Sequence, residues 1–240
     1  MQQRLATLHG ATRILARNGA SGHVAHSIVE SCALALRLGA DGVDLDAATN
    51  DNVVFVGGER HVRRRLPGVT RAVPAVPLVD VVGHVDFVRG STIALRADEE
   101  TFRELEPMLP GVLSVVPVSC LLVVDDTVAN PSIAPSTTFE CYVRSALGSM
   151  SGGPERFFAN ARNNGWVGVV LSDDDWTGGL VTLAHRFGLS AFADSVVREH
   201  RAVDLVRMGA DVISGRWPER IVAARDAATS QGDTSRPTGM

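Results

Sequence analysis

Lysine is missing from this chain of 240 residues, so all 23 of its basic residues are arginines. Without lysine, the protein can form no Schiff base through a side-chain amine and has no ammonium group to tune as a general base. These two kinds of mechanism are therefore excluded. The codon usage of a GC-rich genome is sufficient to explain the arginine bias itself.

Cysteine and long apolar runs are also scarce. The three cysteines, Cys32, Cys120 and Cys141, show no Cys-x-x-Cys spacing and cannot all pair with one another, which favours reduced thiols. The first residues lack the apolar segment of a signal peptide, and no run reaches the ~18 apolar residues that a transmembrane helix needs. We therefore expect a cytoplasmic protein with no transmembrane segment.

Positive charge is not concentrated anywhere in a way that suggests a polymeric anion as partner. The net charge is -4, and no basic stretch is interleaved with aromatic residues, so we expect no nucleic-acid partner. The basic run from Arg60 to Arg65 is short, as is usual for a solvated turn.

Short β-branched runs alternate with helical patterns along the chain, which predicts βα units and a parallel sheet. The predicted helices are residues 26–38, 99–109, 154–163, 179–187 and 199–208, and Pro110 is expected to end the second of them. The predicted strands are residues 13–17, 42–46, 53–56, 92–96, 167–171, 190–194 and 211–214, with one or two more within 113–124. Residues 1–225 are expected to form one domain. Residues 226–240 are polar without apolar periodicity and predict a disordered tail.

Two segments carry a recognisable pattern. The first, from Ala16 to Glu59, includes GADGVDLD at the end of a predicted helix, and the second runs from Leu180 to Ile221. They resemble the amino-terminal and carboxy-terminal blocks of the glycerophosphodiester phosphodiesterase family, and weaker similarity at VPLVDVV and STIALRA extends over nearly the whole chain. The resemblance implies a TIM-type (β/α)8 barrel with a closed parallel sheet. It also implies a phosphoric diester hydrolase site at the carboxyl-end mouth and a role in lipid metabolism.

The chain departs from this family at the positions of the general acid and base. The family has a His-Arg pair after its first strand, where this chain has Arg17 and Asn18, and a later His-Asp pair, where it has Gly58 and Glu59. Arginine cannot act as a base at neutral pH. General acid–base catalysis contributes about 10²–10⁴-fold. Ordinary glycerophosphodiester hydrolysis is therefore expected to be weak or absent.

The family's metal-binding carboxylates are only partly kept. Asp44 and Asp46 stand at the position of the family's Glu-x-Asp pair and, being two residues apart on a strand, project to the same face. Together with His26 they are candidate ligands for Mg²⁺ or Ca²⁺; no organic cofactor is implied. The family's third carboxylate is Ala94 here. Alternatively, the two aspartates are a relic pair, hydrogen-bonded to neighbouring arginines.

Three arginines align with strand ends at the same mouth. Arg17, Arg96 (in place of a family lysine) and Arg216, with Asn18, are candidates for binding an anionic, phosphorylated small molecule, because guanidinium groups match phosphate bidentately. The alternative is internal salt bridging from Arg17 or Arg96 to the aspartates. Asp194 ends a predicted strand, and we assign it a catalytic role with Asp44, Asp46 and His26.

Other polar residues have mainly structural interpretations. His61 could act as a displaced base but is more typical of a surface turn, and His9 fits a less favoured alignment of the first family histidine. His185 and His200 lie on predicted helices. The acidic run from Asp173 to Asp175 could line the mouth or cap the next helix.

Three functions remain open from the sequence. The first is a repurposed enzyme, hydrolase-like or a lyase or cyclase derived from that family, acting on a phosphate-bearing or other anionic small molecule. The second is an inactive barrel that binds a ligand or a protein. The third is a metal-dependent phosphodiesterase that uses displaced residues such as His26 or His61. The sequence does not indicate the oligomeric state.

Overall fold

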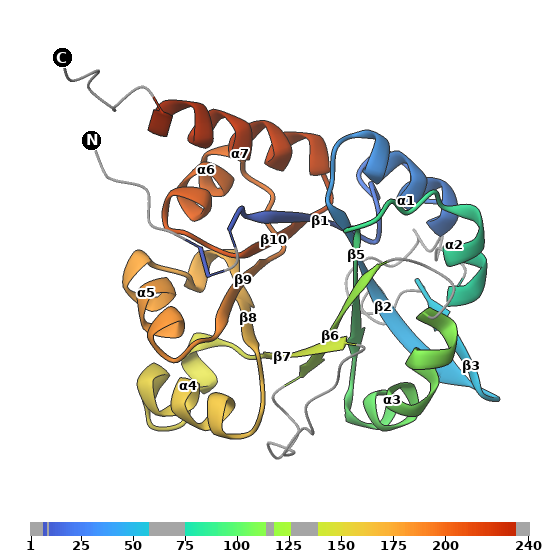
Figure 1. Ribbon diagram of the computed structural model, residues 1–240, viewed down its shortest axis with the longest axis horizontal. Helices are drawn as coiled ribbons and strands as arrows, with labels where there is room; N and C mark the ends of the chain where they lie inside the picture. Colours follow the sequence, from blue (N-terminus) through green and yellow to red (C-terminus); the bar gives the residue numbers. More distant parts are fainter. Residues whose placement is uncertain (1–6, 9, 58–74, 114–117, 126–138, 234–240) are drawn as a thin grey trace, which may run out of the picture.

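The computed structural model describes residues 7–8, 10–57, 75–113, 118–125 and 139–233, and their strands form a closed parallel barrel (Figure 1). Each barrel strand is hydrogen-bonded to a parallel neighbour on both sides, and β1 closes the ring by pairing with both β10 and β2. The predicted TIM-type barrel is confirmed. Its strands are β1 (Arg13–Arg17), β2 (Gly42–Asn50), β5 (Thr92–Ala97), β6 (Ser119–Asp125), β7 (Phe139–Arg144), β8 (Gly168–Ser172), β9 (Ser190–Asp194) and β10 (Val212–Gly215).

Helices surround the barrel on its outside (Figure 1). They are α1 (Ile28–Arg37), α2 (Leu78–His84), α3 (Glu99–Leu113), α4 (Gly153–Asn163), α5 (Gly178–Arg186), α6 (Glu199–Arg207) and α7 (Pro218–Asp233), with short 3-10 turns η2 (Leu147–Ser149) and η3 (Asp173–Asp175). In the described part of the chain, no helix is both long and apolar enough to cross a membrane.

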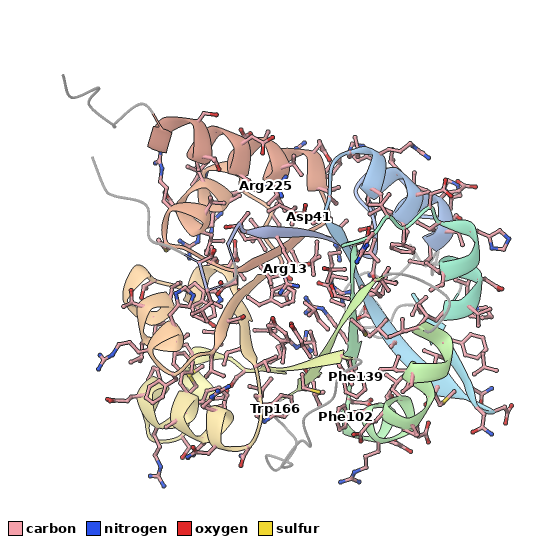
Figure 2. All side chains as sticks on the ribbon, viewed as in Figure 1. Arg13, Asp41, Phe102, Phe139, Trp166 and Arg225 are labelled. Carbon is pink, nitrogen blue, oxygen red and sulfur yellow. The ribbon has the colours of Figure 1, made fainter. Side chains whose placement is uncertain are left out.

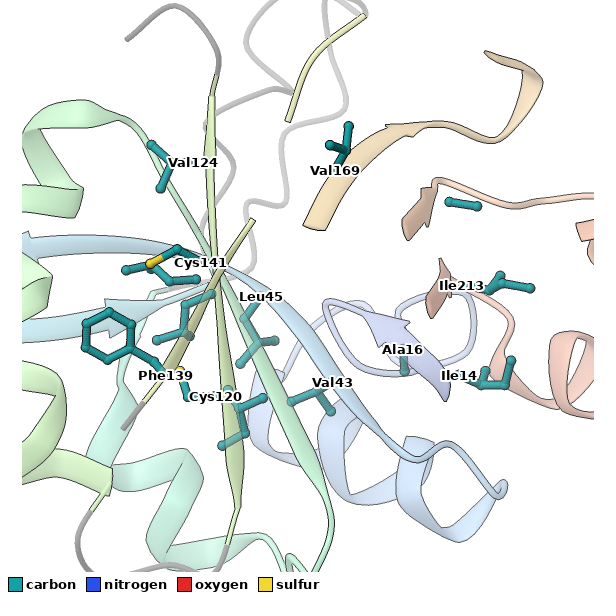
Figure 3. Packing of buried hydrophobic residues seen from close by; sticks show 14 of the residues in the cluster. Ile14, Ala16, Val43, Leu45, Cys120, Val124, Phe139, Cys141, Val169 and Ile213 are labelled. Atoms are coloured by element: carbon teal, nitrogen blue, oxygen red, sulfur yellow. The ribbon is translucent and has the colours of Figure 1, made fainter. Parts of the chain in front are cut away.

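Alternation of side chains along the strands creates two apolar layers. The outward row, including Val43, Leu45 and Ile213, packs between the barrel and its helices (Figure 3). The inward row fills the barrel itself with Leu15, Ala94, Leu121, Val123, Tyr142, Val170, Phe192 and Val212. The barrel is therefore a packed core, and only its ends are open to solvent.

The cysteines belong to the outer layer. All three are free and buried, and Cys120 and Cys141 lie on the neighbouring strands β6 and β7 (Figure 3). Burial raises the pKa of the Cys32 thiol to about 12. Such thiols are inert packing residues.

The predicted strand at residues 53–56 exists but lies outside the barrel. It is β3 (Val53–Val56), which pairs antiparallel with the far end of β2 and also with β4 (Val76–Pro77). Asp51 and Asn52 link β2 to β3 with φ angles of 47° and 59°, the left-handed conformation that a tight hairpin turn requires. This hairpin extends β2 beyond the barrel wall.

Two predicted boundaries are corrected. α3 passes Pro110 and ends at Leu113, because Leu105, Leu109 and Leu113 are buried at helical spacing while Pro110 lies on the exposed side. Helix α7 runs to Asp233, into the expected tail, where the small side chain of Ala228 is buried one turn after that of Ala224. Residues 234–240 lie outside the described residues.

An ion pair fastens α7 to the barrel. The Nη1 atom of Arg225 donates to Oδ2 of Asp41 at 2.5 Å, and the same oxygen accepts the backbone N–H of Ile14 at 2.7 Å (Figure 2). The loop before β2, the strand β1 and the last helix therefore meet at the amino end of the barrel.

Candidate functional site

An arginine–aspartate network occupies the barrel interior near the carboxyl ends of its strands. Asp44 and Asp46 come from β2, Arg96 from β5 and Asp194 from β9. β2 and β5 are neighbours in register, with Asp46 opposite Arg96 and Asp44 opposite Ala94. Together with Arg17 at the end of β1, they form what we call the mouth network.

The guanidinium of Arg96 bridges two carboxylates. Its Nε and Nη2 atoms donate to the two oxygens of Asp44 at 2.6 and 2.5 Å. Its Nη1 and Nη2 atoms donate to the two oxygens of Asp194 at 2.7 and 2.8 Å. Phe192 lies beneath the group, with its ring centroid 5.8 Å from the guanidinium carbon. Bidentate hydrogen bonds between a guanidinium group and a carboxylate are short, directional and charge-assisted.

Asp44 is fully buried, and both of its carboxylate oxygens accept hydrogen bonds. Besides Arg96, the hydroxyl of Ser214 on β10 donates to its Oδ2 atom at 2.5 Å. Burial alone would raise the pKa of Asp44, but the charges of Arg96 and Arg17 and the hydrogen bonds from Arg96 and Ser214 outweigh it, so the pKa lies below its usual value. Burial opposes the charge of Arg96 as well, yet Asp44 and Asp194 hold its pKa well above the ordinary value. Both groups are therefore charged at neutral pH.

Arg17 is bound in the same way to the second aspartate of β2. Its Nη2 atom donates to Oδ1 of Asp46 at 2.6 Å, and its Nη1 atom donates to Oδ1 of Asn18 at 3.1 Å and to the carbonyl of Asp44 at 3.3 Å. Asn18 has a left-handed φ of 52° and donates its own N–H to that carbonyl at 2.7 Å. The geometry of Arg17 and Arg96 thus matches internal salt bridging, the second of the two interpretations of these arginines.

The charge balance of the mouth network follows from these contacts. Three carboxylates, Asp44, Asp46 and Asp194, face two guanidinium groups, which leaves one net negative charge. Arg216, the third candidate for the anion clamp, is exposed. The network therefore has no surplus positive charge with which to hold an anion.

The proposed metal ligands do not assemble. The imidazole of His26 is 73% exposed and its Nε2 atom faces Oε2 of Glu30, in the first turn of α1, at 3.3 Å, whereas Asp44 is buried inside the barrel. Across the described ranges, no group of three His, Cys, Asp or Glu side chains is placed to hold a metal ion. The oxygens of Asp44, which the resemblance assigned to a cation, are bonded to Arg96 instead.

A hollow of about 500 Å³ opens beside this network at the ends of β6 to β9. In it, Nε of Arg144 donates to Oδ1 of Asp125 at 2.5 Å. Neither Nη atom of Arg144 has a hydrogen bond to the described residues. Ser172 and Ser195 are exposed, and Ser195 has a left-handed φ of 62° directly after Asp194. The residues lining the hollow include Asp125, Arg144, Ser145, Ser172, Asp194 and Ser195.

Arg144 was not among the predicted site residues because β7 was not predicted, and Asp125 lies one residue beyond the segment 113–124 in which a strand was expected. The available signal was the alternation of FECYVR, in which Phe139, Cys141 and Val143 face outward and are buried. Since side chains alternate along a strand, this pattern would have turned Arg144 toward the inside at the strand's carboxyl end. Asp194, which was predicted to end a strand, does end β9, and it lines this hollow together with Ser195.

His23 is a further residue that the sequence did not predict as part of the site. Its Nε2 atom lies 3.1 Å from Oε1 of Glu219, and its ring meets that of Trp217 edge-on, with centroids 4.7 Å apart. Gly22 lies against the same indole, where a Cβ atom would come within 2.6 Å of the ring. These contacts join the loop after β1 to the loop after β10.

The remaining candidates have structural partners or cannot be placed. Nε2 of His185 lies 2.8 Å from Oδ2 of the buried Asp211, in keeping with a structural role. In the acidic run, Asp175 accepts the N–H of Leu147 at 3.3 Å, while burial and the neighbouring Asp174 raise the pKa of Asp173. Outside the described residues lie His9, Gly58, Glu59 and His61.

Comparisons with known proteins agree on the fold. The sequence matches no model of a known protein family and no curated protein. Among solved structures, a phosphodiesterase from Oleispira antarctica, in complex with the product sn-glycerol-3-phosphate, superposes with a TM-score of 0.68 at 16% identity, covering 90% of this chain and 97% of that one. A glycerophosphodiester phosphodiesterase from Thermotoga maritima gives 0.68 at 14% identity, with 90% and 99% covered. One from Parabacteroides distasonis gives 0.67 at 14% identity, with 92% and 98% covered. This chain thus has the complete barrel fold seen in glycerophosphodiester phosphodiesterases.

Proposed function

We propose that this protein is a divergent glycerophosphodiester phosphodiesterase-like barrel that has no resident metal, does not hydrolyse glycerophosphodiesters and binds a small phosphorylated molecule at its mouth. The observation that carries the proposal is the double fork of Arg96 on Asp44 and Asp194. The guanidinium of Arg96, a permanent cation, occupies the position beside Asp44 where the resemblance implied a divalent metal ion.

A metal ion would have to compete with that guanidinium. Hydrogen bonds that involve charged groups contribute about 1.5–3 kcal/mol each, and Arg96 makes four of them. Displacing Arg96 would also leave a buried guanidinium without a partner, which costs several kcal/mol more. Binding of Mg²⁺ or Ca²⁺ at Asp44 is therefore disfavoured relative to the resident ion pair.

The two residues that stand where the family has its first His-Arg pair also cannot accept a proton. Arg17 and Asn18 stand at the end of β1, and Arg17 is tied to Asp46. Neither residue can accept a proton at neutral pH. This supports a binding role in place of the ancestral reaction.

The hollow beside the network offers a phosphate group new partners. The hydroxyls of Ser172 and Ser195 and the two Nη atoms of Arg144, whose Nε atom is paired with Asp125, are hydrogen-bond donors on its wall. Arginine forks and hydroxyls together bind phosphate oxygens. Because the phosphodiesterase from Oleispira antarctica contains sn-glycerol-3-phosphate, that ester is the first ligand to test.

The experiment has two arms. Hydrolysis of glycerophosphocholine is measured with and without added Mg²⁺ or Ca²⁺, and binding of sn-glycerol-3-phosphate is measured by calorimetry. We expect no cation-dependent hydrolysis, and binding that Arg144→Gln weakens about tenfold, equivalent to ~1.4 kcal/mol. Arg186→Gln, at an exposed arginine on α5 far from the hollow, is the matched control. Rapid cation-dependent hydrolysis would refute the proposed loss of activity. An unchanged affinity of Arg144→Gln for sn-glycerol-3-phosphate would refute the proposed binding site.

A repurposed enzyme is the second candidate, and the pair of His23 with Glu219 favours it. A histidine oriented by a carboxylate is the usual arrangement of a general base. Turnover of phosphate esters that is abolished by His23→Gln but kept in His26→Gln would select this candidate over pure binding.

A further inference from the structure

A second hollow lies at the opposite, amino-terminal end of the barrel. It has a volume of about 590 Å³ and is bounded by α1, by the end of α2 and by the segment that leads into β5. Sites for small organic ligands typically have volumes of about 300–1,000 Å³, a range that includes the volume of this hollow. The residues on which the argument rests are Leu36, Arg37, Asp41, Asp86, Val88 and Arg89.

The charges around this hollow favour an anion. Arg37 and Arg89 come from different segments, are exposed and form no ion pair with the described residues. Asp41 also lines the hollow, but its Oδ2 atom is held by Arg225 and by the N–H of Ile14. Asp86 is then the one lining carboxylate without a described ion pair, so two guanidinium groups outweigh it by one charge.

The same hollow has an apolar side. Ala33, Leu36 and Ala40 line it from α1 and the turn that follows. At its rim Val88 is 69% exposed, the most exposed of the large apolar side chains in the described ranges. An apolar surface next to two guanidinium groups that form no ion pair with the described residues complements a ligand that has both an anionic group and an apolar body.

We propose that this amino-end hollow is a binding site for an organic anion, a phosphate or carboxylate attached to an apolar group, held by Arg37 and Arg89. The site is separate from the mouth, because the two hollows share no residue and open at opposite ends of a packed barrel. It does not depend on what the mouth binds.

Phenyl phosphate is a suitable probe, since it joins a dianion to an apolar ring. Its binding is followed by ¹⁵N NMR of the full chain, with inorganic phosphate and benzyl alcohol as probes of the charge and the ring alone. We expect phenyl phosphate to shift the amide signals of Gly90 and Ser91 and to bind at least tenfold more tightly than either partial probe. The double variant Arg37→Gln/Arg89→Gln should lose at least tenfold in affinity.

Two controls separate this site from others. Arg186→Gln removes an exposed arginine elsewhere, and Arg144→Gln changes the mouth. In both variants phenyl phosphate should shift the amide signals of Gly90 and Ser91 with the same affinity as in the parent. The proposal is overturned if phenyl phosphate does not shift Gly90 and Ser91, if the double variant binds as well as the parent, or if Arg144→Gln abolishes the shifts.

Discussion

Replacing Arg96 by alanine tests the mouth network most directly. The change removes the guanidinium that bridges Asp44, which is 0% exposed, and Asp194, whose side chain is 12% exposed. Breaking a buried ion pair by deleting one partner typically costs about 3–5 kcal/mol, because the remaining charge is left buried and uncompensated. We therefore expect the variant to lose about 3–5 kcal/mol of unfolding free energy at neutral pH.

The pH dependence of that loss identifies its cause. In the parent, the pKa of Asp44 lies below its ordinary value of 3.8, so its ion pairing stabilises the fold above that pH and is lost as the pH falls toward the depressed value. Without Arg96, burial becomes dominant and should raise the pKa of Asp44, so that the variant is destabilised as the pH rises. The difference between the two proteins should thus be large near pH 7 and smaller near pH 4.

Urea denaturation followed by the fluorescence of the buried Trp166 and Trp176 measures this difference at both pH values. Arg198→Ala is the matched control, since its pair with Asp174 is exposed on both sides and such pairs contribute about 0–1 kcal/mol. Adding Asp44→Asn to Arg96→Ala removes the orphaned charge and should recover part of the loss. A loss at neutral pH no larger than in Arg198→Ala, or one as large near pH 4 as near pH 7, would refute the reasoning.

Further predictions concern the rest of the molecule. Gly22→Ala should destabilise the protein by about 1–3 kcal/mol, because its Cβ would press against Trp217; an unchanged urea midpoint would contradict this. Arg225→Ala frees Asp41 at the amino-end hollow and should weaken phenyl phosphate binding there, whereas equal or tighter binding would speak against the charge argument. Burial raises the pKa of Cys32, Cys120 and Cys141 to about 12. These thiols should therefore react with a thiol reagent at pH 8 only after unfolding. Fast reaction of the native protein would show that at least one of them is accessible.

Much of the barrel could be predicted from local patterns. The runs at residues 13–17 and 190–194 are β1 and β9 with the expected bounds, because buried strands of a parallel barrel are short, apolar and bounded by turns. β7 was missed, since FECYVR is preceded by a long polar stretch and mixes charged with apolar residues. The end of α7 was missed for a related reason, because alanines pack against the barrel there without an apolar stripe.

The candidate site, too, could be predicted only in part from the sequence. The sequence alone determined that Asp44 and Asp46 share a face of one strand and that Arg96 and Asp194 end others, because the two-residue period of a strand is a local property. It could not decide between a metal site and an ion-pair network, since both use the same carboxylates. Only the tertiary structure decided that Arg96 reaches Asp44 and Asp194 at once, because closure of the barrel brings β2, β5 and β9 around one interior. In that buried interior the carboxylates of Asp44 and Asp194 need a positive partner, and Arg96 contacts both of them.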